Sequence, residues 1–124
     1  FYPPMSPTGM YVDLFRLTAD MNSTADQAFV QVFPFTRYSI REVNAIGGTG
    51  ITAAGGIYSA PGKAGRQIVP ADHSWALLVT PDCMDMPALD PDASNELSAA
   101  PYLSLTTPQG APATATITIM GVAG

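Results

Sequence analysis

The sequence predicts an all-β protein, a single-domain antiparallel β-sandwich with the jelly-roll arrangement of about eight strands. Short runs of branched and aromatic residues recur at spacings of roughly ten residues, and turns that contain glycine or proline separate them. Over Thr114–Ile119, threonine alternates with alanine and isoleucine, the period of two of a strand with one wet and one buried face. A chain of 124 residues is long enough to bury one core.

We expect an extended arm over residues 1–10 and a sandwich over residues 11–124 with a long acidic loop at 81–100. The arm, FYPPMSPTGM, holds three prolines and cannot form a helix or an inner strand. Its aromatic and methionine side chains need a groove, on their own domain or on a neighbour. The predicted strands are Met10–Thr18, Ala28–Phe33, Arg37–Ile46, Ile51–Ser59, Arg66–Val69, Ser74–Thr80, Pro101–Thr107 and Ala113–Met120.

Local irregularities are also predicted. The third strand alternates imperfectly, which a bulge near Arg41 would reconcile. The glycines of Gly47–Gly50 precede another strand-like run and no helix, which favours a hairpin turn over a phosphate-binding loop. Gly55 and Gly56 indicate a bulge or the close approach of another backbone.

The stretch Pro101–Ala123 reads as two strands joined by a turn that holds two prolines and a glycine. The exposed face of its second strand consists of threonines with no charge, and therefore lacks the lysine that usually protects a sheet edge. This strand is either an inner strand or an edge that meets another subunit.

The segment Pro81–Ala100 contains five of the ten acidic residues: Asp82, Asp85, Asp90, Asp92 and Glu96. We interpret it as a long solvated excursion between strands, with a helical turn over Ser94–Ala99 and with Met84 and Met86 as adaptable partner contacts. Asp90, Asp92, Ser94 and Glu96 have the alternating spacing of calcium ligands, but the Gly and Glu of the helix-loop-helix site are replaced by Asn95 and Pro101. Calcium binding remains an alternative.

Composition limits the partners. A net charge of −5 and a pI near 4.3 argue against nucleic acid, whose binding needs clustered cations. The one cysteine, Cys83, excludes an internal disulfide and a thiolate zinc site, and we expect it to be buried or idle. The sequence contains no apolar run of membrane-spanning length and no signal-peptide pattern. Only 12% of residues are charged, which suits a surface that packs against neighbours.

No catalytic, cofactor-binding or metal-binding residues are predicted, and the chain is not expected to be an enzyme. The sole histidine, His73, has no second histidine or cysteine for a metal, and Asp72 would point to the opposite face of a strand. Trp75 stands in the most apolar strand and is expected in the core.

Four stretches carry a resemblance: SPTGMYVDLFRLTADMNSTADQAF, AAGGIYSAPGKAGRQIV, SWALL and PYLSLTTPQGAPATATITIMG. Together they cover over half of the chain and resemble a family of small virion proteins encoded by tailed bacteriophages, while Pro81–Asn95 matches least well. The resemblance implies a structural component of the virion with no defined activity.

Combined with the composition, this predicts a capsid decoration (cement) protein on the capsid surface. Its partners would be the major capsid protein or other virion proteins, and it would form a homo-oligomer, most simply a trimer, without nucleic acid or membrane. The alternative is a tail or head-fibre module that binds a host-surface glycan or another virion protein. A third reading, a calcium-dependent adhesion domain, depends on Asp90 and Asp92.

Overall fold

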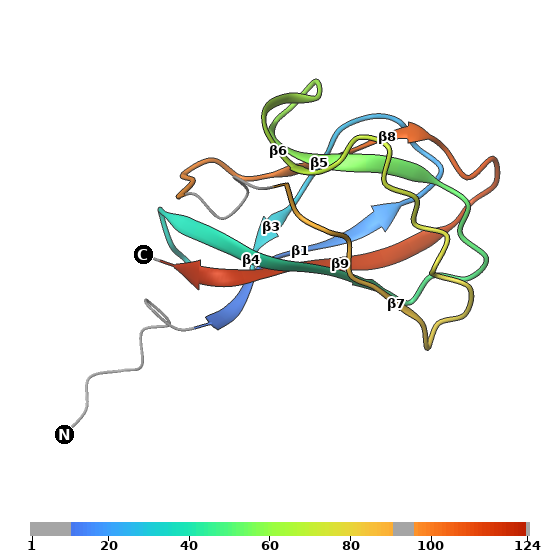
Figure 1. The fold of residues 1–124 in the computed structure, drawn as a ribbon, viewed down its shortest axis with the longest axis horizontal. Helices are drawn as coiled ribbons and strands as arrows, with labels where there is room; N and C mark the ends of the chain where they lie inside the picture. The colour runs from blue at the N-terminus through green and yellow to red at the C-terminus, as the bar shows by residue number, and fades with distance from the viewer. Residues whose placement is uncertain (1–10, 91–95, 124) are drawn as a thin grey trace.

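Two antiparallel sheets face each other in the computed structural model, which describes residues 11–90 and 96–123 (Figure 1). One sheet has the strand order β3-β1-β9-β4-β7 and the other β2-β8-β5-β6. The predicted all-β antiparallel sandwich is therefore confirmed. The strands are β1 (Tyr11–Asp20), β2 (Gln27–Ala28), β3 (Val30–Gln31), β4 (Tyr38–Ile46), β5 (Ala54–Ala60), β6 (Ala64–Val69), β7 (Met84–Asp85), β8 (Tyr102–Thr107) and β9 (Thr114–Ala123).

The pairings are nested along the chain. β1 pairs with β9, β2 with β8, β4 with β7, and β5 with β6, so that each pair lies inside the previous one in sequence. The pairings of β9 with β4 and of β8 with β5 then join these ribbons into the two sheets. Only the two-residue strand β3, which extends the first sheet beside β1, stands outside this scheme among the described strands.

The predicted hairpin over Pro101–Ala123 is wrong, although both of its strands exist. β8 belongs to the four-stranded sheet and β9 to the five-stranded sheet, so residues 108–113 cross between the layers. β9 lies between β1 and β4, which settles its position as an inner strand. Neighbouring strands shield its threonine face at Thr118, which is 9% exposed and lies opposite Arg16 and Asn44, while Thr114 at the start of the strand is exposed.

The link from β4 to β5 also crosses between the sheets, so the predicted hairpin turn at Gly47–Gly50 is wrong as well. The predicted close approach at the next glycines is confirmed. A Cβ atom on Gly56 would lie 2.4 Å from the Val69 carbonyl oxygen. A Cβ atom on Gly55 would lie 2.4 Å from the Leu105 Cα, and the ladder with β8 shifts register between Ala54 and Gly55.

The bulge in β4 is confirmed. The register of β4 with β9 shifts between Ile40 and Glu42, which leaves Arg41 as the extra residue. As a result Tyr38 and Ile40 on one side of the bulge, and Val43 and Ala45 on the other, all point into the core. One extra residue thus restores a common buried face to a strand that does not alternate strictly.

Two strand predictions need correction. The run 28–33 is split, because Ala28 pairs with β8 in one sheet while Val30 pairs with β1 in the other. The run Ser74–Thr80 contains no named strand, and its only described ladder contact is the isolated bridge between Ser74 and Ala54. Turns occupy it instead, since the Leu78 amide donates to the Trp75 carbonyl.

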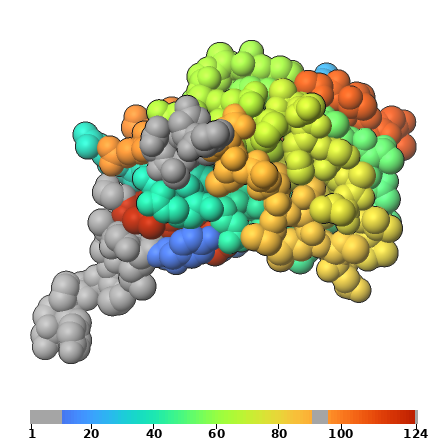
Figure 2. Space-filling view, in the orientation of Figure 1, coloured from blue at the N-terminus to red at the C-terminus, as the bar shows by residue number. Residues whose placement is uncertain are grey.

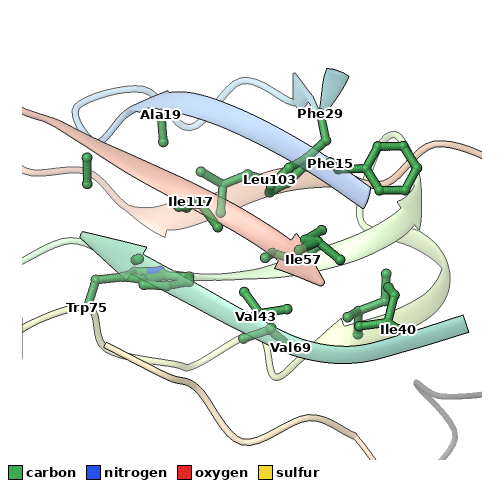
Figure 3. Close-up of a cluster of buried hydrophobic side chains, with 14 of the residues drawn as sticks. Phe15, Ala19, Phe29, Ile40, Val43, Ile57, Val69, Trp75, Leu103 and Ile117 are labelled. Atoms are coloured by element: carbon green, nitrogen blue, oxygen red, sulfur yellow. The ribbon is translucent and has the colours of Figure 1, made fainter. Parts of the chain in front are cut away.

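The core fills the space between the sheets (Figure 3). Leu103 and Ile57 from one sheet meet Ile117 and Val43 from the other, all at most 1% exposed. An aromatic cluster closes one end, where the Phe15 ring lies 4.9 Å from that of Tyr38 and 5.2 Å from that of Phe35 in edge-to-face geometry. Such pairs add about 0.5–1.5 kcal/mol beyond the burial of their area.

Residues 81–90 and 96–100 form a strap across the open side of the sandwich, between β4 and β6. At its start β7 pairs with Ala45 and Ile46 of β4. The Asp90 amide then donates to the Ile68 carbonyl of β6 at 3.0 Å, and Leu97 forms a bridge with Tyr38 at the other end of β4. Because Leu89 and Leu97 pack against the core, the interpretation as a solvated excursion is wrong for this part.

Candidate functional site

Exposed apolar side chains gather at one end of the sandwich, over residues 46–51 and 75–86. Five of the eight exposed large hydrophobic residues described belong to this surface, which we call the apolar end: Ile46 (39% exposed), Leu77 (64%), Val79 (57%), Met84 (49%) and Met86 (55%). The yellow atoms of residues 75–86 lie at the right of the molecule in Figure 2, below the orange-red atoms at its upper right. Scattered apolar residues are normal on a surface, whereas apolar residues that gather in one place are typical of contact sites.

Backbone pairing holds these side chains together. Ile46 and Met84 are opposite each other in the β4–β7 ladder, and both side chains point away from the core. The Val79 carbonyl accepts from the Gly50 amide at 2.8 Å, and the Leu78 carbonyl accepts from the Ile51 amide at 3.0 Å. The two segments therefore lie side by side, and residues 75–80 are fixed against the chain that leaves β4.

The turn conformation of residues 75–80 explains why such apolar residues are exposed. In a strand, Trp75, Leu77 and Val79 would share one face. In the turn, Trp75 and Leu78 both enter the core at 0% exposed, and the residues between and after them point outward. The indole Nε1 of Trp75 donates to the Gly55 carbonyl oxygen at 3.2 Å, which confirms the predicted core position and satisfies its polar atom.

A histidine–aspartate contact ties the strap to the start of this turn. His73 Nε2 lies 3.0 Å from Asp85 Oδ2, and Asp85 is 1% exposed. The His73 ring stacks edge-on against Trp75, with ring centroids 4.6 Å apart. The sequence indicated no partner for His73, because Asp72 was the only neighbouring carboxylate. Asp85 stands between Met84 and Met86, and nothing in the sequence around it indicated that its side chain is buried.

Two further acidic residues of the strap, Asp90 and Glu96, contact the protein's own groups. Asp90 Oδ2 accepts from the Gln67 side-chain amide at 2.7 Å, and Glu96 lies 3.6 Å from Arg37. Within residues 11–90 and 96–123 no three metal-ligating side chains come together. Asp92 and Ser94 of the calcium alternative lie outside the described residues, as does the start of the predicted helical turn, while Glu96–Ala99 show no helix.

The sequence predicted that Cys83 is buried or idle, and in the structure its side chain is partly buried. Its Sγ lies 3.4 Å from the Thr80 hydroxyl, and its amide donates to the Thr80 carbonyl at 3.0 Å. The hydrogen bond with the Thr80 side chain lowers the pKa of the thiol below its ordinary value. These contacts close the turn that carries the chain from the apolar segment to β7.

The outer faces of the two sheets carry polar contacts. On the five-stranded sheet, the Tyr11 hydroxyl donates to Glu42 Oε1 at 2.7 Å, and Asn44 donates to Glu42 Oε2 at 2.9 Å. On the four-stranded sheet, Lys63 Nζ donates to the buried Ser104 hydroxyl at 2.9 Å. These faces are therefore more polar than the apolar end.

Comparison with protein-family models, with curated proteins and with solved structures found no match. Among the described residues there is no helix with the length and apolarity needed to cross a bilayer. The apolar end, held by the His73–Asp85 contact and the β4–β7 ladder, is the feature of the described surface that best fits a binding role.

Proposed function

We propose that this chain is a structural protein of a phage virion, a capsid decoration (cement) protein that stabilises the head by subunit–subunit contacts. The observation that carries the proposal is the apolar end: exposed methionines and branched residues on a protein in which only 12% of residues are charged. Interfaces between proteins are depleted in lysine and glutamate and enriched in methionine. The resemblance in four stretches to small virion proteins of tailed phages supports the same role.

We further assign the sandwich to the jelly-roll type. A jelly roll is a two-stranded ribbon rolled into two sheets, so that its strands pair first with last. The nested pairs β1–β9, β2–β8, β4–β7 and β5–β6 fit this scheme. Viral capsid domains and lectins both use the jelly roll, so this fold is compatible with the proposed role without requiring it.

The mechanism follows from repetition. Each subunit buries apolar side chains against a neighbour and gains a modest free energy. On a symmetric shell the same contact recurs many times, and the effective concentration of each further contact is high once the first has formed. A homo-oligomer, such as the expected trimer, would multiply the contacts per unit and hold capsomers together.

The glycan-binding alternative has weaker support. Recognition of sugars by aromatic stacking needs an exposed ring, and Trp75 is 0% exposed. Among the described aromatic residues only Tyr11 is exposed, at 51%, and its hydroxyl already donates to Glu42. A contact with another virion protein in a tail or fibre would use the same apolar end, so location within the particle separates these roles.

The test is the copy number of this chain in intact particles. Quantitative mass spectrometry of purified virions should give a count in fixed proportion to the major capsid protein, and particles that lack the chain should release their genome at a lower temperature. Adding the purified protein back should restore the original temperature. An absence from the head, or a handful of copies per particle, would contradict the cement role and point to the tail.

A further inference from the structure

We propose that the apolar end binds the uncharged arm, residues 1–10, of a second copy of this chain, in a head-to-tail contact. This inference rests on the proposed assembly role and names the subunit contact within it. The juxtaposition behind it is that the arm joins β1 at one end of the sandwich while the apolar end lies at the other (Figure 1).

The chemistry of the two surfaces matches. The sequence FYPPMSPTGM contains no Asp, Glu, Lys, Arg or His, and it offers Phe1, Tyr2 and two methionines. The five side chains of the apolar end are likewise uncharged, with the exposed Asp82 beside them, and Met84 and Met86 can adapt their shape to an irregular ligand. Proline fixes the backbone φ angle, so the three prolines of FYPPMSPTGM lower the conformational entropy that binding must remove.

The strand register shows how far apart the two features are. Tyr11 lies opposite Val122 of β9, and Ile46 lies opposite Thr116. Six residues of β9 separate these levels, or about 20 Å at the rise of a strand. Ten extended residues span at most about 36 Å, so the arm of a neighbouring copy is long enough to reach across a subunit boundary.

The outer face of the same copy is a poor path for its own arm. The arm would have to reverse direction at Tyr11 and pass over Asp13, Arg16 and Glu42, which occupy the outer face of β1 and β4. Apolar side chains gain little against this charged surface. A second copy can present its arm to the apolar end without that reversal.

Such a contact is heterologous, because two different surfaces of the same protein meet. Heterologous contacts close into rings when the rotation between copies permits and otherwise form open filaments. A ring of a few copies would give the kind of unit that the proposed role requires.

Self-association of the purified full chain tests this, by sedimentation velocity over a range of concentrations. Leu77→Ser combined with Val79→Ser, and separately deletion of residues 1–10, should each weaken association by at least about tenfold. Val30→Ser combined with Val32→Ser, on exposed positions of and beside β3, is the matched control and should leave it unchanged. Met84→Gln is a second variant, should the double serine variant lose its melting transition.

Complementation then identifies the geometry. A copy without the arm keeps its apolar end, and a copy with the serine variant keeps its arm, so a mixture of the two should form a dimer that does not grow. A wild-type chain that stays monomeric at millimolar concentration would overturn the proposal. So would association that survives loss of the arm, or a mixture that forms no dimer. These results concern the isolated protein, so they are distinct from a failed copy-number test.

Discussion

His73 Nε2 lies 3.0 Å from Asp85 Oδ2 at the junction between the strap and the turn that holds Trp75. Asp85 is 1% exposed, and the contact gives its carboxylate a partner. Asp85→Ala should therefore lower the free energy of unfolding by about 1–3 kcal/mol, because the imidazole of His73, only 19% exposed, loses its hydrogen-bond partner. Asp85→Asn should cost less, since an amide oxygen or N–H can still pair with Nε2. Urea unfolding measures both.

The exposed Asp82 provides the control for this pair. Asp82→Ala should change stability by no more than about 0.5 kcal/mol, as surface substitutions usually do. Equal losses for Asp82→Ala and Asp85→Ala would show that His73–Asp85 contributes nothing specific.

Gly56 is fixed by the approach of β6. A methyl group there would lie 2.4 Å from the Val69 carbonyl oxygen and 2.9 Å from that of Pro70, both backbone atoms that cannot rotate away. Gly56→Ala should cost at least the upper part of the about 1–3 kcal/mol range for overpacking. In Gly110→Ala the new methyl group has no atom within 4 Å. Only the strain of an alanine at the positive φ of 88° should therefore lower stability, by about 1 kcal/mol. Thermal melts that rank the two variants in the opposite order would refute this account.

Gln109 joins two of the links that cross between the sheets, the one from β4 to β5 and the one from β8 to β9. Its side-chain oxygen accepts from the amides of Thr52 at 2.7 Å and Ala53 at 3.2 Å, and its Nε2 donates to the Gly50 carbonyl at 2.9 Å. Gln109→Ala should cost about 1–2 kcal/mol and speed proteolysis within residues 108–113. Gln109→Glu keeps the acceptor and loses the donor, so it should fall between alanine and wild type. If Gln109→Glu is as unstable as Gln109→Ala, the whole loss of stability comes from the hydrogen bond to the Gly50 carbonyl.

Two tyrosines with raised pKa values should make the stability of the protein fall at alkaline pH. Burial raises the pKa of Tyr38 above its ordinary value, and its hydroxyl donates to the Ala99 carbonyl. Partial burial and the hydrogen bond to Glu42 raise the pKa of Tyr11 to about 12. A group with a raised folded pKa contributes its full stability below its unfolded pKa, near 10, and loses it as pH rises through the folded value. Unfolding free energy should therefore fall above about pH 10.

Urea titrations at pH 8, 10 and 11.5 give that profile. Tyr38→Phe removes the larger contributor, so its profile should be flatter than that of the wild type above pH 10. If both profiles decline in parallel, groups other than Tyr38 govern the alkaline loss.

The longer strands of this protein, such as β1, β4 and β9, follow from local sequence, whereas their pairing partners do not. Period-two alternation identified β9, and the broken alternation of β4 located the bulge at Arg41. The choice between a hairpin and a crossing is different. Packed sheets lie about 10 Å apart, and six residues such as 108–113 span up to about 20 Å. The link between β8 and β9 is therefore long enough for a hairpin within one sheet and also for a crossing to the other sheet.

The apolar end was hidden from sequence for a related reason. An apolar run such as Ser74–Thr80 is compatible with a buried strand, and also with a turn that places every third residue in the core. Over so short a run, the spacing of apolar residues does not distinguish the two structures. Asp85 gave no sign of burial, because the His73 that pairs with it is twelve residues away in sequence. Methionines 84 and 86, by contrast, were expected as contact residues and are exposed.

The position of β9 has a consequence for how the protein folds during synthesis. It is the last described strand to leave the ribosome, yet it separates β1 from β4 at the middle of its sheet. Until it arrives, both of those strands lack their longest partner, and their apolar faces stay open to solvent. Contacts between such distant parts of a chain form slowly, over roughly milliseconds to seconds for all-β domains. The nascent chain thus carries two strands that lack their longest partner until β9 is made, and chaperone binding at that stage would protect it from aggregation.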